Sequence, residues 1–132
     1  MLDLAILVLR LSMATVMIPH GLHKLGRLDF LDKKWLDQYG MPKGSAALSS
    51  VLEIVCGVAM LIGAFTSVAA LVLFIVMLVG TWTSIWKEHE PYLSLPTGKG
   101  WDFNIFLVGA LVAQILLGDG AWSVLRLFTG TP

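Results

Sequence analysis

The fold is decided by the stretch Leu4-Ala-Ile-Leu-Val-Leu-Arg10-Leu-Ser-Met-Ala-Thr-Val-Met-Ile18, an apolar run of helix length that carries one formal charge. A second such run extends from Ala46 to Gly63 and holds Glu53 near its middle. A charge at the centre of a bilayer costs roughly 2.5 to 3.5 kcal/mol in insertion measurements, so such a residue normally faces the interior of a bundle and has a partner. We therefore expect Arg10 and Glu53 to be each other's partner.

The composition is that of a membrane protein. The 132 residues are 57% hydrophobic and 14% charged, with a mean hydropathy of +0.82, whereas average soluble domains are about 25% charged. This length suits one domain, residues 1–132, with about four spans, because a helix needs ~20 residues to cross a hydrocarbon core of ~30 Å. Nine basic residues balance nine acidic ones, so no attraction to nucleic acid is implied. Cys56 is the single cysteine, so the chain alone offers no C-x-x-C redox pair.

Turn residues and periodicity divide the chain into four spans and one short helix. The predicted spans cover residues 2–19, 45–63, 68–86 and 102–118, and Pro19 is expected to close the first. Between the first two, apolar residues recur at helical spacing while charged residues take the other faces. These apolar residues are Leu28, Leu31, Trp35 and Tyr39. The predicted fold class is all-α: an integral membrane four-helix bundle with a short interfacial amphipathic helix, about 28–39, between the first two spans.

The first two spans have features that let them approach each other. Small or polar residues recur every three or four positions along the second span: Ser49, Ser50, Glu53, Cys56 and Gly57. Counting ten residues back from His20 to Arg10, and nine forward from Gly44 to Glu53, places the two charges about 15 and 14 Å below one surface. In antiparallel neighbours they can meet, either as a buried ion pair that specifies packing or as a ligand or proton site.

Two further groups of residues are candidates for chemistry. His20, His23 and Lys24, with His89 from a later loop, form a polar group at one surface. No metal-ligand motif accompanies these histidines, so we interpret the group as a solvated cluster and predict no metal site. The second group combines Trp82, Asn104 and Gln114 with the aromatic residues Trp86, Tyr92 and Trp101. It can supply the apolar slot and hydrogen-bond donors of a quinone pocket, or it is an ordinary aromatic belt with interhelical hydrogen bonds.

The distribution of basic residues predicts the orientation. The connections 20–44 and 87–101 hold Lys24, Arg27, Lys33, Lys34, Lys43, Lys87 and Lys99. The opposite side has only Arg126. By the positive-inside rule, both connections are expected to be cytoplasmic, in a multi-pass protein of the cell (inner) membrane.

The chain resembles the DoxX-type membrane proteins along nearly its whole length. The resemblance is carried by Arg10, by His20-Gly-Leu-His-Lys-Leu25, by Glu53-Ile-Val-Cys-Gly57 with Leu61-Ile-Gly63, and by Gly118-Asp-Gly-Ala-Trp-Ser123, which is similar to a closing G-x-G-x-x-S. The aspartate that often follows this serine is Leu125 or Arg126 here. The resemblance implies a four-helix membrane bundle with an oxidoreductase-linked function. Relatives include the membrane subunit of thiosulfate:quinone oxidoreductase and proteins linked to thiol-stress complexes.

The leading hypothesis is a membrane subunit of, or partner to, an oxidoreductase that is linked to quinones or to small sulfur or thiol compounds. The candidate catalytic residues are Arg10 and Glu53, and the candidate substrate-binding residues are His20, Lys24, Asn104, Gln114 and Trp82. No covalently bound cofactor is expected, and a quinone would be a substrate. The expected partners are the lipid bilayer, a soluble oxidoreductase subunit and a second copy of the chain. The alternatives are a non-catalytic membrane anchor or assembly protein and a small transporter.

Overall fold

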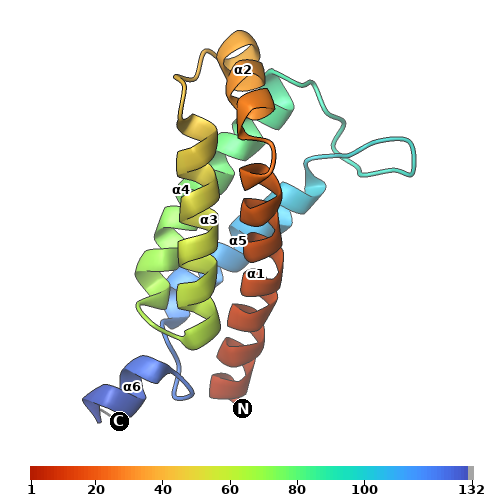
Figure 1. Ribbon diagram of the computed structural model, residues 1–132. Coiled ribbons are helices and arrows are strands. Elements are labelled where there is room, and N and C mark those ends of the chain that lie inside the picture. The colour runs from red at the N-terminus through yellow and green to blue at the C-terminus, as the bar shows by residue number, and fades with distance from the viewer. Residues whose placement is uncertain (131–132) are drawn as a thin grey trace.

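Helices make up 75% of the computed structural model, which describes residues 1–130. They are α1 (Leu2–Leu25), α2 (Leu28–Tyr39), α3 (Ser45–Ile62), α4 (Thr66–Trp86), α5 (Asp102–Leu117) and α6 (Val124–Thr129). The four apolar helices α1, α3, α4 and α5 form a bundle, while α2 lies across one end and α6 lies at the other (Figure 1). We refer to these as the α2 end and the α6 end. The chain is an all-α four-helix membrane bundle.

The lengths of the bundle helices fit a membrane unequally. By length and composition, α1, α3 and α4 can each cross a bilayer. The fourth, α5, is apolar but has only 16 residues, or about 24 Å of helix, against a hydrocarbon core of ~30 Å. The predicted ranges of α3, α4 and α5 agree with the observed helices to within two residues.

The prediction that α1 ends at Pro19 was wrong. The helix continues through this proline to Leu25, so the residues from His20 to Lys24 are helical. Proline removes one backbone hydrogen bond but is tolerated inside membrane helices, where neighbouring groups satisfy the freed carbonyls. The carbonyl freed by Pro19 is that of Thr15; in the same turn, the His20 ring hydrogen-bonds through Nδ1 to the Val16 carbonyl at 2.8 Å. Gly21 lies beside Ser50 and Glu53, so the extra turns of α1 pack against the first half of α3.

Glycines allow the close packing of α1 on α3. A Cβ atom added at Gly21 would lie 2.6 Å from Ile54 Cγ1 and 2.7 Å from the Ser50 carbonyl oxygen. A Cβ atom at Gly57 would lie 2.7 Å from Ile18 Cγ1. These distances are too short for real contacts, so the two backbones approach to a separation that only glycine permits. The prediction that the small-residue face of the second span contacts another helix is confirmed.

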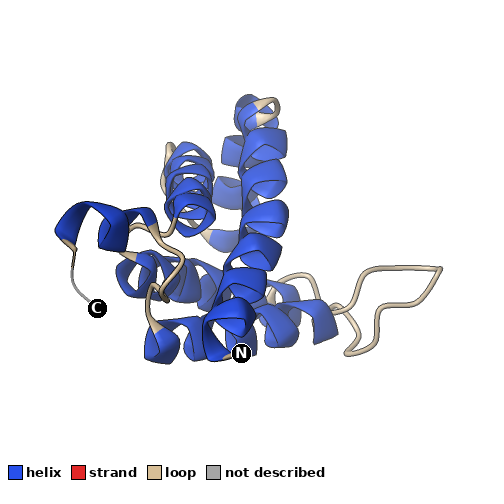
Figure 2. Cartoon of the chain, turned by 90° about the horizontal axis from the view of Figure 1, so that it is seen from below, coloured by secondary structure: helices blue, strands red, loops and turns tan. Residues whose placement is uncertain are grey.

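The hydrophobic core lies between all four bundle helices. Its buried members are Met13, Met17, Cys56, Met60, Ala69, Ala70, Leu73, Leu107 and Leu111. Above this core, α2 is joined to the start of α3, because Asp32 Oδ1 accepts hydrogen bonds from the backbone N–H groups of Gly44 and Ala46. The connection 87–101 extends sideways from the bundle as a hairpin closed by paired Leu95 and Gly98 (Figure 2). Beyond this core, the α2 end of the bundle contains polar and aromatic side chains.

Candidate ligand site

Arg10 and Glu53 do not pair with each other, although both are buried. Arg10 donates from Nε to the Met60 carbonyl at 3.1 Å and from Nη1 to the Asp119 carbonyl at 2.5 Å. Glu53 instead accepts from Lys24 Nζ, which lies 2.6 Å from Oε1. The expected pairing of Arg10 with Glu53 was therefore wrong.

The extension of α1 beyond Pro19 explains the error. Glu53 lies beside Gly21 of α1, where an added Cβ atom would be 3.2 Å from Glu53 Cβ, whereas Arg10 is eleven residues earlier on the same helix. At 1.5 Å per residue, the two charges therefore differ in depth by about 16 Å. Arg10 belongs to the α6 end and Glu53 to the α2 end.

At the α6 end, Arg10 joins the end of α3 to the turn that follows α5. The Asp119 carboxylate accepts a hydrogen bond from the Thr66 backbone N–H at 2.7 Å, which ties the same turn to the start of α4. A Cβ atom at Gly63 would lie 2.7 Å from Arg10 Nη1, so glycine is required beside the guanidinium. The arginine therefore contacts the closing motif 118–123 through the Asp119 carbonyl.

Gln114 takes part in this same structural cluster. Its Nε2 donates to the Gly118 carbonyl at 2.7 Å and to Thr66 Oγ1 at 3.2 Å. The side chain is fully buried between α4 and α5. Gln114 thus forms an interhelical hydrogen bond, the alternative raised by the sequence, and does not line the cavity described below.

At the α2 end, Lys24, Ser49 and Glu53 form a compact polar group. Lys24 Nζ donates to Ser49 Oγ at 2.9 Å as well as to Glu53 Oε1, and the Ser49 hydroxyl donates to Oε1 at 3.4 Å. The Glu53 side chain is 4% exposed and that of Lys24 is 22% exposed. The Trp35 ring from α2 covers the ammonium group, with its centroid 5.5 Å from Nζ. The pair is therefore an ion pair screened from water by an aromatic ring.

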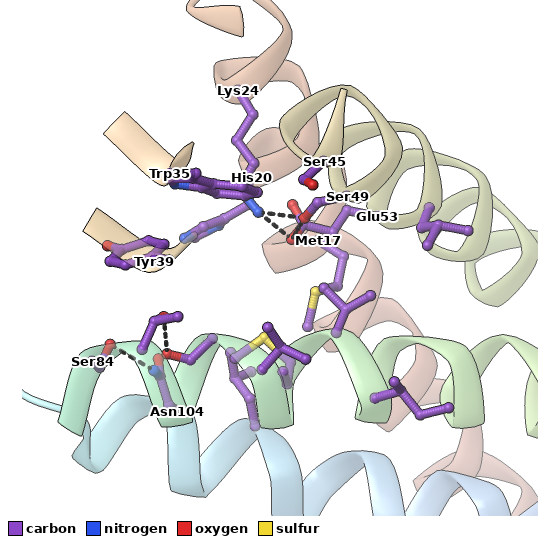
Figure 3. Close-up of a pocket in the computed structure, with 18 of the residues that line it drawn as sticks. Met17, His20, Lys24, Trp35, Tyr39, Ser45, Ser49, Glu53, Ser84 and Asn104 are labelled. Atoms are coloured by element: carbon purple, nitrogen blue, oxygen red, sulfur yellow. Dashed lines mark hydrogen bonds and ion pairs between the residues drawn. The ribbon is translucent and has the colours of Figure 1, made fainter. Parts of the chain in front are cut away.

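This polar group forms part of the wall of a cavity of about 480 Å³. Figure 3 shows Lys24, Ser49 and Glu53 on one side, Trp35 and Tyr39 beside them, and Ser84 with Asn104 on the facing wall. The lining contributed by α1 is Val16, Met17, His20 and Lys24, and that of α2 includes Lys34, Trp35 and Tyr39. The remaining apolar lining includes Leu48, Leu52, Ile75, Val76, Met77, Val79, Phe103 and Leu107. All four bundle helices and α2 thus enclose one largely apolar space with a charged group in its wall.

The structure brings together four of the seven candidate site residues. His20, Lys24, Glu53 and Asn104 all line the cavity. Asn104 is buried and donates to Ser84 Oγ at 3.4 Å. Arg10 and Gln114 lie in the α6-end cluster. Trp82 is 45% exposed and contacts Lys87, whose Nζ lies 5.4 Å from the ring centroid, so it is part of the aromatic belt.

Sequence reasoning missed the contribution of α2 to the site. Its apolar stripe was assigned to the membrane interface, yet Trp35 and Tyr39 on this stripe cover the cavity. The signal was present, because an apolar face on a helix with no span of its own must be buried against something. Ser49 was also missed as a site residue, although its spacing of four from Glu53 places the two side chains on one helical face.

One carboxylate fastens α2 to the end of α4 at the mouth of the cavity. Glu88 accepts hydrogen bonds from Lys34 Nζ at 2.7 Å and from the Tyr39 hydroxyl. Burial acts to raise the pKa of Glu88, but these two hydrogen bonds and the Lys34 charge outweigh it and lower the pKa to about 2. Burial and the contact with Glu88 raise the pKa of Tyr39. Since the Glu88 pKa is depressed, its stabilising contribution is present at neutral pH and is lost as the pH falls towards 2.

The histidines do not gather into a metal site. Within residues 1–130, no three His, Cys, Asp or Glu side chains lie close enough together to hold a metal ion. His20 and His23 are both exposed on α1, and His89 has a left-handed backbone conformation with φ of 51° in the connection after α4.

The family model for DoxX matches residues 5–86, which is well over half of the chain. The chain belongs to the DoxX family. The match covers α1 to α4, and therefore includes Lys24, Trp35 and Glu53. No curated protein sequence and no solved structure matches the chain. DoxX proteins are membrane-associated and often linked to oxidoreductase-related functions.

Proposed function

We propose that this DoxX protein binds the headgroup of a quinone in the cavity at its α2 end and serves as the membrane subunit of an oxidoreductase. The observation that carries the proposal is the Lys24–Glu53 ion pair, with a buried carboxylate, in the wall of an otherwise largely apolar cavity. Ligand pockets typically measure roughly 300–1,000 Å³, with apolar walls and a few polar groups that fix orientation. The cavity of about 480 Å³ has this character.

The rim of the cavity favours a ligand that arrives from the bilayer. Leu48 on α3 and Ile75 and Val79 on α4 line the cavity and are also exposed on the outer surface of the bundle. In a membrane this surface is covered by lipid tails. A ligand that enters between α3 and α4 can therefore place a polar headgroup near Glu53 and leave a hydrocarbon tail in the lipid.

The polar group suits the proton chemistry of quinones. Reduction of a quinone to its quinol consumes two electrons and two protons, and the reverse reaction releases them. Lys24, Ser49 and Glu53 form a connected set of donors and acceptors that can hold a proton beside the headgroup. We propose that a soluble oxidoreductase partner exchanges the electrons. Because the basic connections adjoin this end, we also propose that it faces the cytoplasm.

Two glycine substitutions test the ligand site. No atom lies within 4 Å of a Cβ atom added at Gly80, which lines the cavity, or at Gly109, which is exposed on α5. Gly80→Phe fills ligand space, and overpacking of roughly 1–3 kcal/mol weakens binding by about tenfold or more. Gly109→Phe adds the same ring on the lipid-facing surface and leaves binding unchanged.

The measurement is calorimetric binding of a short-chain benzoquinone to the protein in lipid nanodiscs, with empty nanodiscs as the blank. The proposal predicts saturable binding to wild type and Gly109→Phe and weakened binding to Gly80→Phe. Uptake of the quinone no greater than that of empty nanodiscs, or equal affinity for all three proteins, would overturn it.

A further inference from the structure

One buried acceptor in the cavity wall has no hydrogen-bond partner. Among residues 1–130, the buried side-chain atoms in this condition are Glu53 Oε2, Glu90 Oε2 and Gln114 Oε1. Of these three residues, only Glu53 lines the cavity. A buried charged oxygen that lacks a donor is unfavourable by more than a neutral one, so it marks a place where a ligand can supply the missing hydrogen bond.

The neighbouring donors are already used. The Lys24 ammonium donates to Glu53 Oε1 and to Ser49 Oγ, and the Trp35 ring lies beside it, with its centroid 5.5 Å from Nζ. Two other hydroxyl groups of the lining donate to backbone carbonyls, Ser45 to Pro42 and Thr83 to Gly80, while Ser84 Oγ accepts from Asn104. At the charged end of the cavity, Glu53 Oε2 is therefore an unfilled carboxylate acceptor, whereas the Trp35 indole N–H in the same lining is a neutral donor.

The other polar groups of the lining are paired with neighbouring residues or can bind either a donor or an acceptor on a ligand. At the mouth, Lys34 is paired with Glu88 and Lys99 is paired with Glu90. If His20 is neutral and donates through Nδ1 to the Val16 carbonyl, its other ring nitrogen is an acceptor. Asn104, on the facing wall, has an amide with both donor and acceptor atoms, so it can bind either kind of oxygen.

We infer that Glu53 Oε2 accepts a hydrogen bond from the ligand, so that the site binds the hydroxyl-bearing quinol in preference to the quinone. The inference rests on the proposed function and adds the redox state that the site recognises. A quinol hydroxyl donates to the carboxylate oxygen, whereas a quinone carbonyl would place a second acceptor against it. The preference is expected to be about tenfold or more, given what a buried unsatisfied charged group costs. For a two-electron couple, tenfold tighter binding of the reduced form raises the midpoint potential by about 30 mV.

The experiment compares a short-chain benzoquinol with the matching benzoquinone under anaerobic conditions, using the protein in lipid nanodiscs. Dissociation constants come from calorimetry, and the midpoint potential of the bound couple comes from a spectroscopic redox titration. Glu53→Gln removes the preference, because a carboxamide offers both a donor and an acceptor at the same position. Glu90→Gln is the matched control, since Glu90 also has a buried oxygen without a partner but lies outside the cavity lining. It retains the preference of wild type.

A ligand series on the unaltered protein gives a test that does not depend on the folding of a variant. The dimethyl ether of the quinol keeps the ring but has no O–H donor, so it binds at least about tenfold more weakly than the quinol. Equal binding of quinol, quinone and ether, or tighter binding of the quinone, overturns the inference while leaving the proposed quinone site in place. Binding of neither the quinol nor the quinone overturns both.

Discussion

Replacing Arg10 with methionine is expected to destabilise the bundle without changing its ligand site. The substitution leaves two carbonyls without their donor, one on Met60 in the last turn of α3 and one on Asp119 after α5. Carbonyls in the last turn of a helix lack partners within the helix. At about 1–3 kcal/mol for each unpaired buried group, the loss is roughly 2–6 kcal/mol. Removal of a buried charge offsets part of this, so we expect a net loss of about 2 kcal/mol.

The assay is reversible unfolding in mixed micelles with increasing SDS, followed by far-UV circular dichroism. Hydrogen exchange of the turn 118–123 reports whether the loss is local to the α6 end. Arg10→Lys keeps the charge but carries all its donors on one nitrogen and cannot reproduce the separate positions of Nε and Nη1, so its stability falls between wild type and Arg10→Met. Folded Arg10→Met protein binds benzoquinone as wild type does. Wild-type stability in Arg10→Met, or loss of quinone binding by its folded fraction, would show that the arginine is not a structural clamp.

Two further predictions concern the contact of α2 with Glu88 and the interface between α1 and α3. Glu88→Gln weakens the contacts of α2, so hydrogen exchange in α2 becomes faster and the pKa of Tyr39 moves down towards its ordinary value. Glu90→Gln is the control for exchange only, because the Glu90 charge also raises the Tyr39 pKa. Unchanged exchange in Glu88→Gln would mean that Glu88 does not hold α2. Gly21→Ala places a Cβ atom 2.7 Å from a backbone carbonyl and costs about 1–3 kcal/mol of overpacking in SDS unfolding, whereas Gly26→Ala, with its nearest contact at 3.6 Å, leaves stability within about 0.5 kcal/mol. Equal stability of the two alanine variants would contradict the close approach of α1 and α3.

The spans were predictable because hydrophobic runs and turn residues act locally. The partners of the buried charges were not, because they depend on helix register. Treating Pro19 as a helix end shifted the expected level of Arg10 by several residues, and that shift alone made an Arg10–Glu53 pair look reasonable. Lys24 was recognised as a cavity residue but not as the counter-ion, since its long side chain reaches back along α1 to Glu53. The apolar stripe of α2 indicated that this helix packs against something, but which surface it covers depends on how the connections fold over the bundle, and no local pattern supplies that.

The buried charges of Arg10 and Glu53 differ in how completely their hydrogen bonds are satisfied. This difference distinguishes a residue that joins two segments of the chain from a candidate ligand-binding residue. Arg10 is held by carbonyls from two segments of the chain that it brings together, and the tight fit of Gly63 leaves no room beside it for a ligand. Glu53 has one oxygen bound by Lys24 and Ser49 and the other buried without a donor in the wall of a cavity. An ion pair needed only for packing gains nothing from an unpaired oxygen, because filling the space with apolar side chains would be at least as stable. The cavity and the unpaired oxygen together are therefore better explained by a ligand that donates a hydrogen bond than by packing alone.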